Sequence, residues 1–173
     1  MAKEVELKIR VLQPQRLQDA LVRVAQREGS YRKKDVYFRG PGGSFRVRDT
    51  DGSLVACRKE KTIEQGIEVS RELEFAVPDL PVFTAFCEGL GYRIWYTKEK
   101  VGQSWRWGDI LIEEGEVLGL GGFAEFEILL AEDADDSAVE RARGTLWKAL
   151  EALGIPRSDV EPRTYSELLG KRG

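Results

Sequence analysis

Pairs of like-charged residues at alternating positions constrain the fold of this chain more than any other feature of its sequence. The first pair lies in "EVELKIR", where Glu4, Glu6 and Lys8 alternate with aliphatic residues. A period of two is typical of a β-strand, because successive side chains of a strand point to opposite faces. Each pair therefore occupies one face of its strand. The other pairs are Arg46/Arg48, Glu72/Glu74, Lys98/Lys100 and Glu125/Glu127.

An exposed sheet does not normally collect charges of one sign, because like charges that face each other across strands are destabilising. A solvated face remains the simpler interpretation of any single pair. The whole set favours a barrel with a polar interior, in which the apolar residues between the charges face outward under helices. We therefore expect Glu4, Glu6 and Lys8 to point inward. Arg10 has the same parity, and the sequence does not decide whether its side chain lies at the barrel mouth or in solvent.

Helical spacing of apolar residues predicts three helices, over 13–30, 78–92 and 135–154. Gly29 is expected to close the first helix, and Asp79 is expected to be the N-cap of the second. A short final helix is expected within 161–170. Strand-like runs fill the intervals, and 93–114 is expected to form two strands joined by a turn at 101–104. Because this order lacks strict alternation of strands and helices, we predict an α+β protein with one antiparallel barrel and helices packed outside.

The composition limits the classes of function. The 173 residues suit a single domain spanning 1–173, and the net charge of −3 disfavours a general nucleic-acid-binding surface. The chain has no histidine, the commonest general base and zinc ligand. Its two cysteines, Cys57 and Cys87, are expected to be packing residues. Without a long apolar run or a signal region, we expect a cytoplasmic protein with no membrane partner.

A barrel interior lined by clustered charges of both signs has an obvious chemistry. Lys and Arg bind polyanions, and Arg matches phosphate oxygens in a bidentate manner. Clustered Glu residues supply the hard oxygen ligands that Mg²⁺ or Mn²⁺ prefers. Phosphoryl or nucleotidyl transfer needs both, since positioning and charge neutralisation carry most of that catalysis.

Motifs in a fixed order extend this interpretation to nearly the whole chain. They are "EVELK", which fits ExExK, then "DVYF" with "FRVR", "RELEF", "KEK", "LGGFAEFE" and "TYSELL". In this order they resemble the CYTH superfamily, the triphosphate tunnel metalloenzymes, which includes class IV adenylyl cyclases, thiamine triphosphatases and inorganic triphosphatases. The resemblance implies an eight-stranded antiparallel β tunnel, and it also allows a homodimer.

The resemblance further implies roles for the charged residues. Mg²⁺ or Mn²⁺ would be held by Glu4, Glu6, Glu125 and Glu127, and catalysis would involve Lys8, Glu4 and Glu6. The triphosphate would be bound by Lys8, Arg46, Arg48, Arg58, Lys98, Lys100 and Arg163. Supporting acidic residues would be Glu72, Glu74 and Glu114. Lys59 is an alternative to Arg58, and Glu113 is an alternative to Glu114. Of the last two, Glu114 has the same parity as Lys98 and Lys100 if no bulge intervenes.

These features favour a divalent-metal-dependent hydrolase that acts on an inorganic or organic triphosphate. A ribose 3′-hydroxyl in place of water would make the same site a class IV-type adenylate cyclase, but no adenine pocket is identifiable. A polyphosphate- or nucleotide-binding module without turnover is a weaker alternative, since an anion receptor gains nothing from buried carboxylates. Trp95, Trp105 and Trp107 are expected to pack in the core or on the outer wall rather than to stack on a base.

Overall fold

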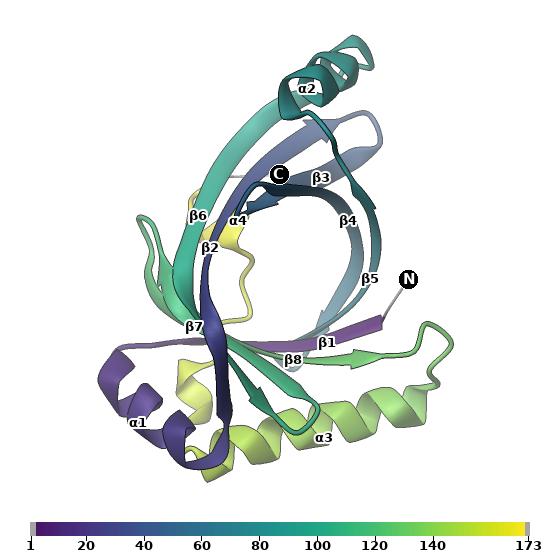
Figure 1. Cartoon of the computed structure of the whole chain (residues 1–173). Helices are drawn as coiled ribbons and strands as arrows, with labels where there is room; N and C mark the ends of the chain where they lie inside the picture. The colour runs from purple at the N-terminus through teal and green to yellow at the C-terminus, as the bar shows by residue number, and fades with distance from the viewer. Residues whose placement is uncertain (1–2, 172–173) are drawn as a thin grey trace.

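A closed barrel of eight antiparallel strands forms the centre of the computed structural model, which describes residues 3–171 (Figure 1). The strands are β1 (Lys3–Arg10), β2 (Gln26–Gly40), β3 (Gly43–Thr50), β4 (Ser53–Glu64), β5 (Ile67–Ala76), β6 (Arg93–Trp107), β7 (Ile110–Val117) and β8 (Gly121–Leu130). Their order around the barrel is β1-β5-β4-β3-β2-β6-β7-β8, and β8 closes the ring by pairing with β1. This confirms the predicted α+β barrel.

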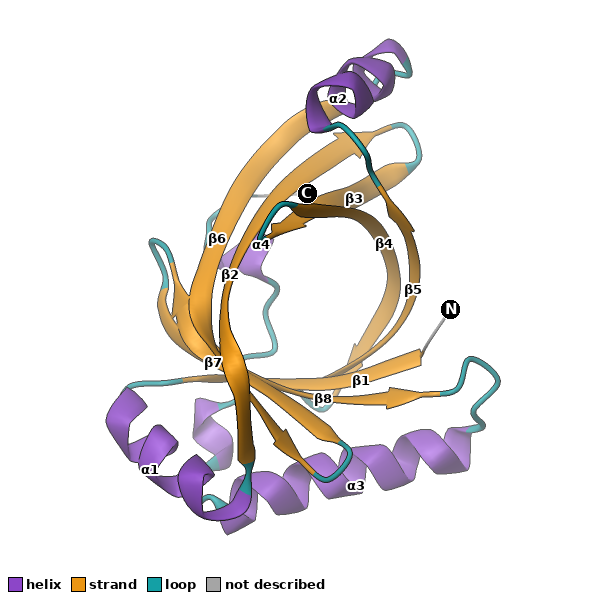
Figure 2. Cartoon of the chain, in the orientation of Figure 1, coloured by secondary structure: helices purple, strands orange, loops and turns teal. Residues whose placement is uncertain are grey.

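The helices lie outside the barrel wall or at its end (Figure 2). They are α1 (Pro14–Val24), α2 (Leu80–Gly89), α3 (Asp136–Ala152) and the short α4 (Tyr165–Leu168), with a 3₁₀ turn at Arg157–Asp159. In Figure 1, α1 and α3 lie along one side of the barrel, near β1 and β8, and α2 lies on the opposite side. None of the described helices is long and apolar enough to cross a membrane.

The apolar core lies between the outer face of the strands and the helices, as the charge pattern predicts. Val5, Leu7 and Phe126 are fully buried there with Leu21 of α1 and Leu146 of α3. Burying one such side chain contributes about 1.5–3 kcal/mol. The helices therefore complete the hydrophobic core, and the barrel interior is left to polar side chains.

The first predicted helix is confirmed, but it ends earlier than expected. It stops at Val24, because Ala25 has an extended backbone and β2 begins at Gln26. Gly29, expected to close the helix, lies within β2 opposite Ser104 of β6. Pairing with a long neighbouring strand prevails here over local helical preference.

The predicted turn at 101–104 is wrong. β6 continues through this segment, and the turn to β7 is at Gly108–Asp109. Gly102 lies opposite Gly115 in the ladder, where a Cβ atom on Gly102 would be 2.0 Å from the Glu114 carbonyl oxygen. The glycine therefore permits a close approach of two strands rather than a turn.

Candidate active site

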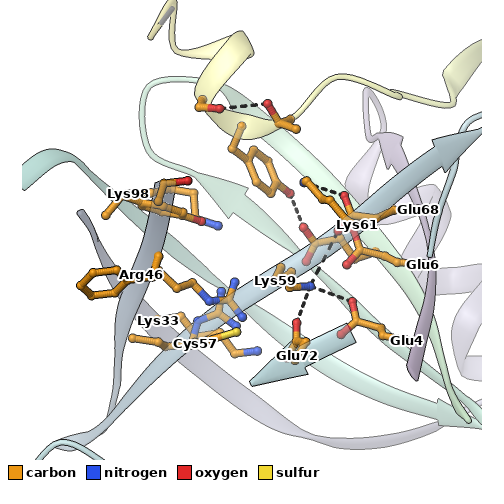
Figure 3. A pocket seen from close by; sticks show the side chains of 18 of the residues that line it. Glu4, Glu6, Lys33, Arg46, Cys57, Lys59, Lys61, Glu68, Glu72 and Lys98 are labelled. Carbon is orange, nitrogen blue, oxygen red and sulfur yellow. Dashed lines mark hydrogen bonds and ion pairs between the residues drawn. The ribbon is translucent and has the colours of Figure 1, made fainter. Parts of the chain in front are cut away.

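A cavity of about 410 Å³ occupies the barrel interior and gathers most of the predicted site residues (Figure 3). Those that line it are Glu4, Glu6, Lys8, Arg46, Arg48, Glu72, Glu74, Lys98, Glu125 and Glu127. They come from β1, β3, β5, β6 and β8, so residues far apart in the sequence meet because alternate positions on every strand face inward.

Two carboxylates in the cavity face each other without a cation between them. Glu6 on β1 is directly opposite Glu127 on β8. No Lys or Arg nitrogen of residues 3–171 lies within 4.0 Å of either carboxylate. Burial and the charge of Glu6 raise the pKa of Glu127 to about 7. Like charges at opposed positions destabilise a sheet, so this arrangement is typical of a site that binds a cation.

Lys59 on β4 is shared by the neighbouring acidic residues. Its Nζ lies 2.9 Å from Glu4, 2.6 Å from Glu72 and 3.9 Å from Glu68 (Figure 3). Lys61 lies 2.8 Å from Glu68, but the two ammonium groups do not neutralise these carboxylates together with the nearby Glu6. Burial, together with Glu6 and the other carboxylates, therefore raises the pKa of Glu4 to about 10 despite the contact with Lys59.

Arginine and lysine side chains from β3 and β6 form a basic region in the same cavity. Arg48 makes a bidentate contact with the buried Asp35, at 2.7 and 2.9 Å, and Lys98 lies 3.1 Å from the same carboxylate. Although burial opposes ionisation, Arg48 and Lys98 hold the pKa of Asp35 well below its usual range. The Nε of Arg46 is buried without a hydrogen-bond partner among the described residues. An unsatisfied guanidinium nitrogen favours an anion as its partner.

Glu125 differs from the other predicted metal ligands because its carboxylate already has partners. Lys100 Nζ lies 2.5 Å from one oxygen, and the Tyr165 hydroxyl donates to the other at 2.6 Å. Although burial opposes ionisation, Lys100 and Lys98 hold the pKa of Glu125 well below its usual value. Lys100 is only 2% exposed and lies behind the cavity surface, so its predicted direct contact with phosphate is not supported.

Lys8 lies at the junction with the chain's C-terminal segment. Its Nζ donates to the backbone carbonyl of Arg163 at 2.5 Å and lies 4.4 Å from the centre of the Tyr165 ring. Burial lowers the pKa of Lys8, and the nearby Glu6 and Glu125 only partly oppose this effect. A lysine with a lowered pKa is a candidate base.

Three predicted side chains point away from the cavity. Arg58 is exposed and lies 3.6 Å from Glu60. It faces outward because the two-residue turn between β3 and β4 places the odd-numbered residues of β4 on the inward face. Lys59, the alternative, faces inward. Arg163 pairs with Glu161 at 2.7 Å at the surface, and only its carbonyl contacts Lys8.

Glu114 is likewise on the outer face, where it accepts a hydrogen bond at 2.8 Å from Gln18 of α1. The two-residue turn between β6 and β7 pairs Ser104 with Glu113, so Glu113 is the residue that faces inward. It contacts Lys33 and lies 3.7 Å from Lys100. Arg10, which the sequence leaves open, pairs with Glu161 at 2.9 Å outside the cavity lining.

Several inward residues were not predicted as site residues. They are Lys33, Asp35, Lys61 and Glu68. A usable signal existed, because Lys33 and Asp35 alternate in "KKDVYF", and Lys61 and Glu68 share parity with Lys59 and Glu72 on their own strands. Trp95 was expected in the core or outer wall, but it lines the cavity, whereas Trp105 is buried in the core.

By donor chemistry, Glu4, Glu6 and Glu127 of the cavity are the candidate ligands for a hard divalent cation. These carboxylate oxygens suit Mg²⁺ or Mn²⁺, and two of the three lack a basic partner within the described chain. Among the described residues, the candidate ligand atoms that lie within 4.8 Å of one another are those of Cys57, Glu72 and Glu74 in the same cavity, so Glu4, Glu6 and Glu127 would have to draw closer around an ion. Burial raises the pKa of the Cys57 thiol to about 12, so it stays protonated, and a thiol is a poor ligand for these cations.

Comparisons with known proteins agree with this geometry. The CYTH domain model matches residues 2–165. Protein MJ0240 of Methanocaldococcus jannaschii, named as a candidate adenylate cyclase, is 24% identical over 96% of this chain and 98% of its own length. A conserved hypothetical protein from Pyrococcus furiosus superposes with a TM-score of 0.82 at 27% identity, over 95% of this chain and 99% of the other. HpAC1 from Hippeastrum, a candidate adenylyl cyclase described as having a dominant triphosphatase activity, gives a TM-score of 0.70 at 19% identity, over 99% of this chain and 95% of the other.

Proposed function

The chain belongs to the CYTH domain family, and on that premise we propose that it is a divalent-metal-dependent hydrolase acting on a triphosphate bound inside the barrel. One observation carries the proposal. One cavity contains two carboxylates, Glu6 and Glu127, and a buried guanidinium nitrogen, on Arg46, and none of the three has a partner of opposite charge or an acceptor within residues 3–171. A metal-bound triphosphate would supply both missing partners.

The basic region would bind the phosphate chain. Arg46 would use its unsatisfied Nε, and Asp35 would keep the Arg48 and Lys98 side chains oriented toward the anion. These fixed charges neutralise phosphate oxygens without reorganising during the reaction.

The acidic region would hold the metal through Glu4, Glu6 and Glu127. A divalent ion bound there supplies charge neutralisation for the phosphates and lowers the pKa of the attacking water. Lys59 would limit the repulsion among the carboxylates before substrate binds. Lys8, whose pKa burial lowers, would accept the proton of the attacking water.

Adenylate cyclase activity is the second candidate, because the M. jannaschii relative is named as a candidate for it. The phosphate contacts would be the same, and a ribose 3′-hydroxyl would replace water as the nucleophile. Products separate the two activities: hydrolysis releases phosphate or pyrophosphate with a shortened substrate, whereas cyclisation of ATP releases cyclic AMP and pyrophosphate.

The test is a panel of tripolyphosphate, ATP and thiamine triphosphate with Mg²⁺ or Mn²⁺, in which all products are quantified. Glu6→Gln should lower turnover by at least about 100-fold while the unfolding midpoint is retained. Glu116→Gln, on the exposed part of β7, is the matched control and should leave turnover unchanged. Cyclic AMP as the main product would replace hydrolysis with the cyclase function. Binding without turnover of any substrate would favour a non-catalytic module.

A further inference from the structure

Trp95 owes its position in the cavity to an irregularity in β6. In the pairing of β2 with β6, Tyr37 is opposite Tyr96, but the next residue, Phe38, is opposite Ile94. Trp95 is therefore the extra, unpaired residue of a β-bulge. Bulges re-aim side chains and are frequent beside active sites.

The bulge brings two consecutive aromatic side chains to the same cavity. In a regular strand, neighbouring residues point to opposite faces, yet both Trp95 and Tyr96 line the interior. Their rings meet edge to face with centroids 4.9 Å apart, and Tyr96 stacks on Tyr37 at 4.2 Å. The Trp95 ring is thus held in place by a rigid aromatic neighbour.

One face of the Trp95 ring already holds a planar group. The guanidinium of Arg39 lies over it, 4.7 Å from the ring centroid. Arg39 is exposed at the end of β2, opposite Ser44, which also lines the cavity. Because Trp95 and Ser44 both line the cavity, the indole is presented to a flat ligand ring that enters from this mouth.

The distance between Trp95 and the phosphate-binding region suits an organic triphosphate. Trp95 is three positions from Lys98 along β6, which corresponds to roughly 10 Å of strand. A ligand whose phosphates contact Lys98 and Arg46 therefore extends toward Trp95 only if it carries a further group. Inorganic triphosphate has no such group.

We propose that Trp95 is a stacking platform for the planar heterocycle of an organic triphosphate, and thereby makes the site selective for such substrates over inorganic triphosphate. The inference rests on the proposed function for the position of the phosphates. Aromatic stacking of this kind tolerates different heterocycles, because every such ring has a π-face. A nucleobase and the rings of thiamine share the required chemistry.

The test measures the affinities of tripolyphosphate, thiamine triphosphate and a non-hydrolysable ATP analogue by calorimetry in Mg²⁺. Trp95→Leu should weaken the binding of the preferred organic ligand about 10-fold and change that of tripolyphosphate less than about twofold. Trp95→Phe, which keeps an aromatic face, should retain most of the affinity. Trp147→Leu is the matched control, because Trp147 on α3 also lies under an arginine, at 4.3 Å from Arg157, but outside the barrel.

Whichever organic ligand loses more affinity in Trp95→Leu identifies the source of the heterocycle. Equal weakening of all three ligands, or the same loss in Trp95→Phe as in Trp95→Leu, would overturn the stacking platform while leaving the proposed function intact. Failure of the folded wild-type protein to bind any triphosphate would refute the proposed function and this inference with it.

Discussion

Replacing Glu127 with glutamine should stabilise the metal-free protein at alkaline pH, although it should impair catalysis. Glu127 faces Glu6 across the pairing of β8 and β1, and both side chains are partly buried. Burial and the charge of Glu6 raise the pKa of Glu127 to about 7. Glutamine has nearly the same shape and carries no charge, so it removes the repulsion with little change in packing.

The size of the effect follows from the shift in pKa. A carboxyl group whose pKa rises from 4.5 to about 7 costs about 3 kcal/mol of folding free energy once it is ionised. Between pH 4.5 and about pH 7 the native protein binds more protons at Glu127 than the unfolded chain does, so the free energy of unfolding falls as the pH rises through this range. It stays lower above about pH 7. Glu127 is only partly buried, so solvent reduces the penalty, and we expect a gain of about 2 kcal/mol in Glu127→Gln.

The assay is urea unfolding in the presence of a chelator, at about pH 5 and about pH 9. The wild-type protein should lose about 2 kcal/mol more than Glu127→Gln between the two conditions. Glu116→Gln, an exposed change on the adjacent strand, should behave like the wild type to within about 0.5 kcal/mol. Excess Mg²⁺ should stabilise the wild type at alkaline pH more than it stabilises Glu127→Gln.

A lower stability of Glu127→Gln at alkaline pH would refute this reasoning. It would mean that the Glu127 carboxylate is stabilised by a cationic side chain in solution, and the acidic region would then not be a site prepared for a metal. Equal responses of both proteins to Mg²⁺ would exclude Glu127 as a ligand.

Two further predictions use adjacent or matched positions. Lys59→Ala removes the cation that Glu4 and Glu72 share and should lower the free energy of unfolding by about 3 kcal/mol. The neighbouring Arg58→Ala should lower it by less than about 1 kcal/mol, because Arg58 is exposed. Chemical denaturation measures both changes. Gly102→Ala would place a methyl group 2.0 Å from a backbone oxygen of β7 and should lower the thermal unfolding midpoint sharply, at a cost of about 3 kcal/mol or more. Gly29→Ala, where no described residue beyond its chain neighbours lies within 4 Å of the new atom, should have little effect. Similar losses in the two glycine variants would contradict the close approach of β6 and β7.

The barrel and its reversed polarity could be predicted because strand alternation is a local property of the sequence. The parity of the charged pairs predicts that Glu4, Glu6 and Lys8 point inward, and all three line the cavity. The end of the first helix could not be predicted in the same way, because the helix competes with the pairing of Gln26–Gly29 with β6, which is a long-range interaction.

The two wrong assignments on strands, Arg58 and Glu114, share a physical cause. Each lies after a two-residue turn, at Asp51–Gly52 and at Gly108–Asp109. Across such a turn, an even-numbered residue is paired with an odd-numbered one, so the inward parity changes between the strands. The "DG" sequence is a strong signal for the first turn, and applying this rule would have selected Lys59. The sequence indicates a wrong place for the second turn, because Gly102 resembles a turn residue but lies within β6 opposite Gly115.

The bulge at Trp95 also changes, near the end of β6, which residues face the cavity and which face the core. Because the core and the cavity are the two faces of the same strands, one extra residue in mid-strand would send every following charge into the core and every aliphatic side chain into the cavity. In β6 only Arg93 and Ile94 lie on the far side of the extra residue, so few side chains exchange faces. Single-residue insertions at strand ends can therefore give the barrel mouth new side chains while the deep charge pairs and the helix-covered core are preserved. Substrate range in such a barrel can diversify through the length of its strands as well as through substitution.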